Sequence, residues 1–344
     1  MMFRINGPVA SLVLVFAAIA IAFAFSGCVA RPSPTPVPIG TPTVVLSTPS
    51  PTAAPTAAGM PATPTPTAAP SATPTATGAA PREMAGCASI DEPGTYLLTA
   101  DDEAPGTTCI KITASDVVLD CQNHTLSANH KVDGINVINA RNVTVKNCNL
   151  NRFRMAFLGQ QSEGITFVDN TLRGTYNGIW LESVSGSAFE RNSAWGFSSG
   201  NAIYANNSHG NYFGRNVLGL AQRSVVLWKS GRNTFYKNSM RNSFNEAAYI
   251  YQSDDNRFES NDMDASATRQ SRMYTLFVGN SKNNSFKANA MCSPGYGLSC
   301  NNATEIGDLG GNSCMVQSGC GISCGNCTLR EWYDDPLVPP AIPG

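Results

Sequence analysis

Four cysteines near the end of the chain have a spacing that could hold a metal ion. Cys320, Cys324 and Cys327 are separated by three and two residues, and Cys314 lies six residues before Cys320. Four thiolates spaced in this way are typical of structural zinc sites. Outside the cytoplasm the same residues are oxidised in pairs, and no histidine lies beside them. We therefore expect disulfides here, with no metal and no cofactor.

The total of eleven cysteines fits an exported protein. If Cys28 carries a lipid, ten remain, which is an even number. Cys87 with Cys109, and Cys121 with Cys148, are each about one sequence repeat apart, so they are expected to form pairs. The other six lie in a glycine-rich segment and are expected to close the end of the fold: Cys292, Cys300, Cys314, Cys320, Cys324 and Cys327.

Residues 1–28 predict export. Arg4 is followed by no further charge until Arg31, and the segment 9–25 is apolar. The sequence Phe25-Ser26-Gly27-Cys28 resembles the lipobox of bacterial and archaeal lipoproteins, in which the cysteine is lipidated, although Phe25 stands where leucine is usual. An uncleaved membrane helix is the alternative, because the apolar run is nearly long enough to span a bilayer. Both alternatives predict a secreted, cell-surface protein attached to the membrane through its N-terminus.

Residues 29–84 are expected to form a disordered stalk. Between Pro32 and Pro81 there is neither a charged nor an aromatic side chain, and Pro, Thr, Ala and Ser recur. Such a segment cannot bury a core. Proline favours extended backbone, so about fifty residues could reach about 150 Å. The Thr and Ser hydroxyls are candidate O-glycan sites, and a bare linker is an equally good interpretation.

The charge balance argues against a nucleic-acid partner. The chain has 23 basic and 24 acidic residues and no basic stripe. Nucleic-acid binders concentrate Lys and Arg on one face. We therefore expect no nucleic-acid binding.

From Cys87 onward the chain repeats about every 22 residues. Eight residues before each copy of the clearest motif, and two residues earlier again, lie apolar or small residues, which predicts a strand with alternating inward and outward side chains. The residue types favour short strands over helices. The motif, Phe-x-x-Asn-x-apolar, begins at Phe167, Phe189, Phe213, Phe235, Phe258 and Phe286, and an earlier copy begins at Val145 with Cys148 in place of Asn.

This repeat predicts an all-β solenoid of about seven to nine coils over residues 85–304, closed by a Cys- and Gly-rich cap and tail at 305–344. The Phe column should stack inside, and the Asn column should bond neighbouring amides as a ladder. Met240, Met263 and Met291 fall in an interior column and are expected to be core residues. The largest insertion makes residues 264–273 a protruding loop.

The segments Asn142-Val-Thr-Val-Lys-Asn147 and Asn177-Gly-Ile-Trp-Leu181 resemble the repeat of pectin-lyase-like proteins, and most of all the NosD-like right-handed β-helix repeat proteins. The segment Gly94–Thr99 with Ser115–Asp120 is similar to the cap that opens such domains. The resemblance covers roughly Cys87 to Thr304 and implies a right-handed parallel β-helix. It leaves function open, because this architecture hosts lyases, hydrolases, adhesins and metal-handling proteins.

The NosD-like resemblance also implies a periplasmic copper-handling protein as one alternative. The only histidines are His124, His130 and His209, which do not cluster. Copper prefers imidazole and sulfur ligands. The residues therefore give this alternative no support.

A polysaccharide lyase or glycoside hydrolase is a second alternative. Similar polygalacturonases use Asn-Thr-Asp, Asp-Asp, Gly-His-Gly and Arg-x-Lys motifs in that order to place carboxylates around a sugar bond. Here Asp254-Asp255 and Ser208-His209-Gly210 occur in reverse order, within a turn that elsewhere reads Ser230-Gly-Arg-Asn233. Lyases need a calcium-holding acidic cluster and a base, and Asp262 with Asp264 is the other close acidic pair. We expect no catalytic site.

Outward-facing aromatic residues predict a binding function instead. Rings repeated at the coil rise are expected to form a flat stripe that stacks on successive sugars or on another protein. Coverage of the stripe by the loop 264–273 is the alternative. We therefore expect a non-catalytic glycan- or polysaccharide-binding or adhesion protein. The predicted ligand-binding residues are Trp180, Tyr204, Trp228, Tyr249, Tyr251 and Phe277.

Overall fold

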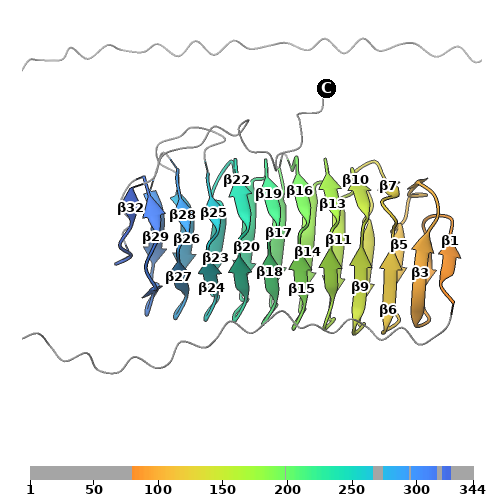
Figure 1. The fold of residues 1–344 in the computed structure, drawn as a ribbon, viewed down its shortest axis with the longest axis horizontal. Helices are drawn as coiled ribbons and strands as arrows, with labels where there is room; N and C mark the ends of the chain where they lie inside the picture. The colour runs from red at the N-terminus through yellow and green to blue at the C-terminus, as the bar shows by residue number, and fades with distance from the viewer. Residues whose placement is uncertain (1–79, 198, 266–273, 294–295, 316–319, 327–344) are drawn as a thin grey trace, which may run out of the picture. The chain divides into compact units, whose positions relative to one another are not determined.

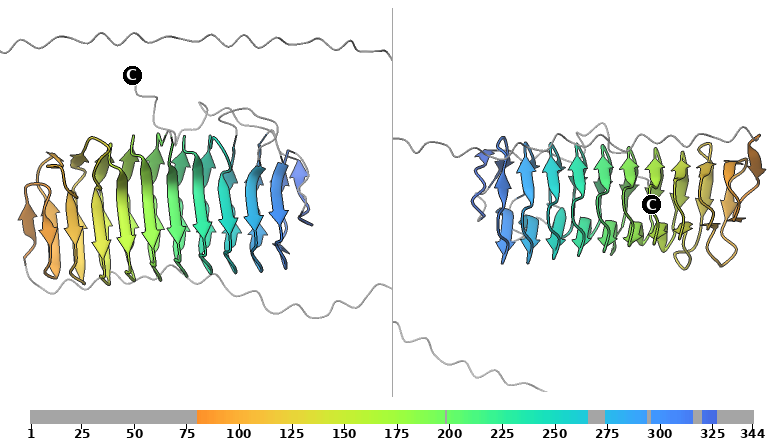
Figure 2. Two further views of the ribbon diagram at one scale, coloured as in Figure 1. Left: turned by 180° about the vertical axis from the view of Figure 1, so that it is seen from behind. Right: turned by 90° about the horizontal axis from the view of Figure 1, so that it is seen from below.

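The computed structural model describes residues 80–197, 199–265, 274–293, 296–315 and 320–326. In these residues the chain winds into a stack of parallel strands, and three sheets run along the stack (Figure 1). Figure 2 shows the same stack from behind and from below. The predicted right-handed, all-β parallel solenoid is confirmed. The leader with Cys28, the stalk up to residue 79, the loop 266–273 and Cys327 lie outside the described residues.

Each coil contributes one strand to each sheet, and equivalent strands of successive coils pair in parallel. Sheet A contains β1 (Arg82–Met84), β3 (Gly94–Leu98), β6 (Val117–Asp120), β9 (Val143–Lys146), β12 (Thr166–Val168), β15 (Ala188–Glu190), β18 (Tyr212–Gly214), β21 (Thr234–Tyr236), β24 (Arg257–Glu259), β27 (Ser285–Lys287) and β30 (Gly307–Asp308). Sheet B contains β2 (Ser89–Ile90), β5 (Ile110–Ile112), β8 (Ile135–Ile138), β11 (Met155–Gln160), β14 (Asn177–Glu182), β17 (Asn201–Asn206), β20 (Arg223–Trp228), β23 (Ala248–Tyr251), β26 (Tyr274–Gly279) and β29 (Tyr296–Asn301). Sheet C contains β4 (Asp102–Glu103), β7 (Thr125–Ser127), β10 (Asn149–Asn151), β13 (Thr171–Arg173), β16 (Ser193–Trp195), β19 (Val217–Gly219), β22 (Ser239–Arg241), β25 (Asp262–Met263), β28 (Ala290–Met291), β31 (Ser313–Cys314) and β32 (Gly325–Asn326).

The core is a column of stacked aromatic rings. Phe235 lies between Phe213 and Phe258, with ring centroids 4.6 Å away on each side and planes 5° from parallel. All three rings are fully buried. Burying one such side chain contributes about 2 to 3 kcal/mol. The predicted Phe column is therefore confirmed, and Met240 and Met263 are buried beside it as expected.

The predicted asparagine ladder is also present. In each coil the buried carboxamide accepts hydrogen bonds from the Asn of the preceding coil and donates to a carbonyl there. Asn238 Oδ1 accepts from the backbone and side-chain nitrogens of Asn216 at 3.0 and 2.9 Å, and Asn238 Nδ2 donates to the carbonyl of Phe213 at 2.9 Å. The ladder satisfies backbone groups at the turn between sheets A and C, which would otherwise be buried without partners.

A second ladder was missed from the sequence, at the turn between sheets B and A. Asn233 repeats the same pattern with Asn211 and with the carbonyl of Ser208. Three positions earlier in each turn, a buried serine hydroxyl accepts from the backbone amide of the preceding coil, as Ser230 does from Ser208. These residues look polar and exposed in the sequence, but their side chains point inward and hold the turns in register.

Disulfides lie toward both ends of the stack. The two expected pairs, Cys87–Cys109 and Cys121–Cys148, are bonded. Cys148 occupies the first rung of the Asn column, where its amide donates to Asn170 at 2.9 Å. At the other end Cys300 bonds Cys320 and Cys314 bonds Cys324, and Cys292 is disulfide-bonded as well. The described cysteines of the C-terminal segment are therefore oxidised, in agreement with disulfides rather than zinc thiolates.

Candidate functional site

The predicted aromatic residues lie on the outer face of sheet B and form pairs. Trp180 on β14 is in register with Tyr204 on β17, and their rings stack 4.0 Å apart at 22°. Trp228 and Tyr251 stack 4.9 Å apart, and so do Tyr249 and Phe277. All six side chains are partly exposed.

The prediction that these rings form a flat stripe is wrong. Nearly parallel rings with centroids 4.0 to 4.9 Å apart lie face to face, so their planes stand across the solenoid axis. Most ring faces are therefore covered by a neighbouring ring, and ring edges point to solvent. The column is also interrupted at Val226, which is 5% exposed. Free ring faces remain only at the ends of each stack.

One such end is the Trp180 ring, on the side that faces β11. The residue in register there is Leu158, whose side chain is shorter than an indole and is buried beneath it. The Trp180 indole N–H donates to Glu182 at 2.9 Å, and the other oxygen of this carboxylate accepts from Gln160 at 3.0 Å. These bonds fix the ring and the carboxylate relative to each other.

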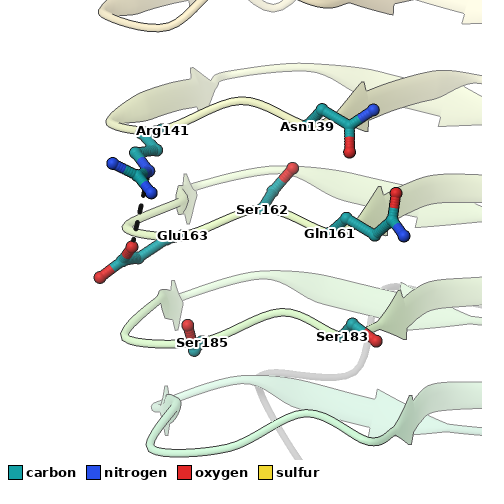
Figure 3. A pocket seen from close by; sticks show the side chains of 7 residues that line it. All are labelled: Asn139, Arg141, Gln161, Ser162, Glu163, Ser183 and Ser185. Atoms are coloured by element: carbon teal, nitrogen blue, oxygen red, sulfur yellow. Dashed lines mark ion pairs between the residues drawn. The ribbon is translucent and has the colours of Figure 1, made fainter.

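Directly beside this group is a depression with a volume of about 400 Å³. It lies over the turns that follow β8, β11 and β14, so Gln161 follows Gln160 and Ser183 follows Glu182 in the chain. Figure 3 shows two rows of side chains on successive turns, with Asn139, Gln161 and Ser183 in one row and Arg141, Glu163 and Ser185 in the other. The lining residues are Asn139, Arg141, Gln161, Ser162, Glu163, Ser183 and Ser185.

The turn geometry explains why these side chains face outward. The first residue of each turn has a positive φ, 49° at Gln161 and 57° at Ser183, and the fourth is Gly164 or Gly186, also with positive φ. Glycine adopts this backbone conformation without steric cost. The second residue then points inward: Ser162 donates to the carbonyl of Gln160 at 2.7 Å and is buried. The first and third residues are left as the two outer rows.

Local side-chain size explains why a depression forms at these coils. Ser183 and Ser185 are short, whereas the preceding turn carries the longer Gln161 and Glu163. Glu163 forms an ion pair with Arg141 at 3.7 Å across the coils. The short serines therefore leave room beside a row of amide, carboxylate and guanidinium groups.

The remaining predicted aromatic residues lie further along sheet B. The Arg223 guanidinium lies 4.9 Å from the centre of the Tyr249 ring and pairs with Glu246 at 2.6 Å. Asn280 donates to the Tyr251 hydroxyl. These residues share the face with Trp180 and Tyr204 but do not line the depression.

The polar motifs weighed for catalysis serve the turns. His209 Nδ1 accepts from the amide of Gly231 at 3.0 Å, and Asp254 accepts from the amide of Lys282 at 2.9 Å. Asp255 accepts from the Asn283 side chain, and Asp262 pairs with Arg241. Each side chain bonds the adjacent coil, so the structure does not bring these residues together around a common point.

The described residues do not fit a copper site either. No group of three or more His, Cys, Asp or Glu side chains converges among them. The three histidines lie on separate coils, and Met240, Met263 and Met291 are fully buried in the core. Imidazole and sulfur ligands are therefore not presented together on the described surface. None of the described residues forms a helix long and apolar enough to cross a membrane.

The depression was not predicted from the sequence. Its residues belong to the turn pattern x-Ser-x-Gly, which repeats at 161–164 and, with Val184 in second place, at 183–186. The signal that could have identified it is the local change from Gln and Glu to Ser at the outer turn positions. That change is visible only when the turns are aligned by coil.

Comparison with solved structures supports the fold. The DFA-IIIase of Arthrobacter chlorophenolicus A6, solved in complex with GF2, has a TM-score of 0.52 at 12% identity, over 66% of this chain and 76% of that chain. The periplasmic alginate epimerase AlgG gives 0.48 at 12% identity, over 63% and 75%. The Azotobacter vinelandii mannuronan C-5 epimerase AlgE6 A-module gives 0.44 at 12%, over 68% and 77%. At these identities the likeness concerns the fold alone.

Comparison of the sequence with known families gives a more specific result. No curated protein matches the chain. The family described as periplasmic copper-binding protein (NosD) matches residues 83–262, just over half of the chain. The protein therefore belongs to the NosD family of right-handed β-helix proteins.

Proposed function

We propose that this protein binds glycans outside the cytoplasm, at the depression over the turns after β8, β11 and β14 together with the adjoining Trp180–Tyr204 pair. The observation that carries the proposal is the contact between two features that sugar sites combine. One is a polar hollow lined by amide, hydroxyl and paired charged groups. The other is an aromatic pair held by a carboxylate.

The size and chemistry of the hollow suit a sugar. Its volume of about 400 Å³ falls in the range typical of small-molecule sites, roughly 300 to 1,000 Å³. Hydroxyls of a sugar can exchange hydrogen bonds with Gln161, Ser183 and Ser185, which are exposed. The apolar face of the ring can lie against the free side of Trp180.

The proposed location rests on the cysteines and on the family. Disulfides are typical of proteins outside the cytoplasm, and the chain has at least four described pairs at its two ends. The matching family is described as periplasmic. We propose export with attachment to the membrane through lipidated Cys28, and adhesion to surface glycans as the use of the site.

Membrane attachment can be tested with Cys28→Ser. The wild-type chain should carry added lipid mass and fractionate with membranes, and the mutant should lack both. A mutant that stays in the membrane without lipid would instead identify the N-terminal apolar segment as an uncleaved helix. Equal lipid mass in both chains would refute Cys28 as the lipid site.

The binding site can be tested with a side chain that fills the depression without disturbing the fold. Ser185, Lys282 and Thr304 occupy the same position of equivalent turns, so Ser185→Lys places in one coil a residue that another coil already accommodates. Thr304→Lys makes the same change outside the depression and serves as the matched control.

The measurement is retention of wild type, Ser185→Lys and Thr304→Lys on a glycan array and on insoluble polysaccharides. Ser185→Lys should lower retention about tenfold or more, and Thr304→Lys should leave it unchanged. Equal retention of all three proteins would contradict the proposed site, and no retention of the wild type by any glycan would contradict the function.

A further inference from the structure

We infer that the glycan recognised at this site is a neutral polysaccharide and not a polyuronate. The inference rests on the proposed function and adds to it the class of ligand. It is drawn from the charges that the described residues place around the depression and the Trp180–Tyr204 pair.

The cation that lines the depression is already neutralised. Arg141 forms its ion pair with Glu163 at 3.7 Å, and both side chains are exposed. A carboxylate of the ligand would have to compete with Glu163 for the guanidinium. The pair therefore offers polar hydrogen-bonding groups without net positive charge.

Glu182 adds a negative charge that no cation balances. Its two oxygens accept from the neutral donors Trp180 and Gln160, and none of the described Lys or Arg side chains forms an ion pair with it. Burial, and next the charge of Glu182, raise the pKa of the adjacent Tyr204 hydroxyl. The field of this carboxylate thus reaches the aromatic pair. With Arg141 at +1 and Glu163 and Glu182 at −1 each, the local charge is −1.

The nearest cation on the aromatic face is also occupied. Arg223 lies against the Tyr249 ring at 4.9 Å and pairs with Glu246 at 2.6 Å. Its guanidinium is partly buried in this arrangement. It therefore balances its own partner and leaves no unpaired positive charge facing Tyr204.

A polyuronate brings one carboxylate on every sugar. Two unit charges 4 Å apart interact by about 1 kcal/mol in water and by more at a protein surface. Like charges placed opposite each other across an interface are an effective way to reject a ligand. A neutral chain of the same linkage avoids that repulsion and keeps every hydroxyl that the hollow can bind.

The test uses polymer pairs that differ only at C6 of the sugar. Retention of the full chain is compared on β-1,4-mannan and β-1,4-mannuronan, and on cellulose oligosaccharides and their C6-oxidised forms, at low ionic strength, where charge effects are largest. The neutral member of a pair should be retained at least tenfold more strongly. Raising the salt concentration should narrow this ratio.

Glu182→Gln tests the cause of the preference, because glutamine can still accept from Trp180. The variant should narrow the ratio of neutral to uronate retention severalfold. Glu305→Gln, which removes an exposed carboxylate elsewhere, should leave the ratio at the wild-type value. A ratio that Glu182→Gln does not change would overturn the inference.

The outcomes separate the two proposals. Stronger retention on the uronate member, lost in Ser185→Lys, would overturn the neutral-ligand inference and leave glycan binding at this site intact. Absence of retention on either member of every pair would overturn the binding function together with the inference.

Discussion

Trp180 and Tyr204 stack on each other across adjacent coils, with centroids 4.0 Å apart. This contact uses one face of each ring and leaves the other Trp180 face toward the shorter Leu158. A repeat protein places identical positions one coil apart, so aromatic residues in successive coils necessarily meet face to face. A sugar can therefore reach only the ends of such a stack, which is why the hollow beside Trp180 decides where binding occurs.

The first prediction concerns Trp180. Trp180→Ala should weaken glycan binding by about 1 kcal/mol or more, since aromatic anchors dominate binding energy at such sites. Titration calorimetry with the best oligosaccharide from the array measures the change. Tyr296→Ala is the control, because Tyr296 also stacks on a neighbouring ring of sheet B, Tyr274, but lies away from the depression. Equal weakening by both variants would argue against a local site.

The second prediction concerns the core. Phe235→Ala should lower the free energy of unfolding by about 3 to 5 kcal/mol, because it leaves a cavity between two stacked rings. Phe277→Ala removes the same side chain from the partly exposed outer face and should cost clearly less. Denaturant unfolding of both variants gives the comparison. A small cost at Phe235 would be incompatible with the ring column.

The third prediction concerns the buried amide ladder. Asn238→Ala should destabilise the fold by about 3 kcal/mol, because it leaves the buried nitrogens of Asn216 and the carbonyl of Phe213 without partners. Asn301→Ala removes an exposed carboxamide and should change stability by less than about 0.5 kcal/mol. Similar unfolding midpoints for the two variants would refute the structural role of the ladder.

The fourth prediction concerns acid stability of the C-terminal coils. Partial burial acts to raise the pKa of Asp308, but hydrogen bonds from the Ser323 and Gly310 amides and the Asn312 side chain outweigh it and hold this pKa below its ordinary value of 3.8. A depressed pKa in the folded state means that the stabilisation is present above the unfolded pKa and is lost as the pH falls through the folded value.

Asp308→Asn should therefore destabilise the protein at neutral pH, and the difference from wild type should shrink below about pH 4. Urea unfolding at a series of pH values measures this. Asp91→Asn removes an exposed carboxylate and is the control. A difference between Asp308→Asn and wild type that grows on acidification would show the opposite linkage.

The sequence predicted the fold well because each structural position recurs. Phe213, Phe235 and Phe258 mark the interior once per coil, and Asn216 and Asn238 mark the turn. A parallel solenoid stacks like residues on like, so the period itself defines the contacts. The pairing of Cys121 with Cys148 could be predicted for the same reason.

The site could not be predicted equally well, because it depends on differences between coils. Whether Ser185 lines a hollow depends on the length of Glu163 in the preceding turn, which a repeat motif averages away. The second ladder was missed because Asn233 and Ser230 resemble ordinary turn residues, although the positive φ at the turn ends directs them inward. Ring orientation at Trp180 likewise follows from its partner in the next coil.

The most direct test of the binding site is a crystal structure of the protein with its best-retained oligosaccharide. The predicted complex has a sugar in the hollow, within hydrogen-bonding distance of Gln161, Ser183 or Ser185 and against the free face of Trp180. A saccharide bound on sheet A, on sheet C or at an end of the stack, with the hollow empty, would contradict the account.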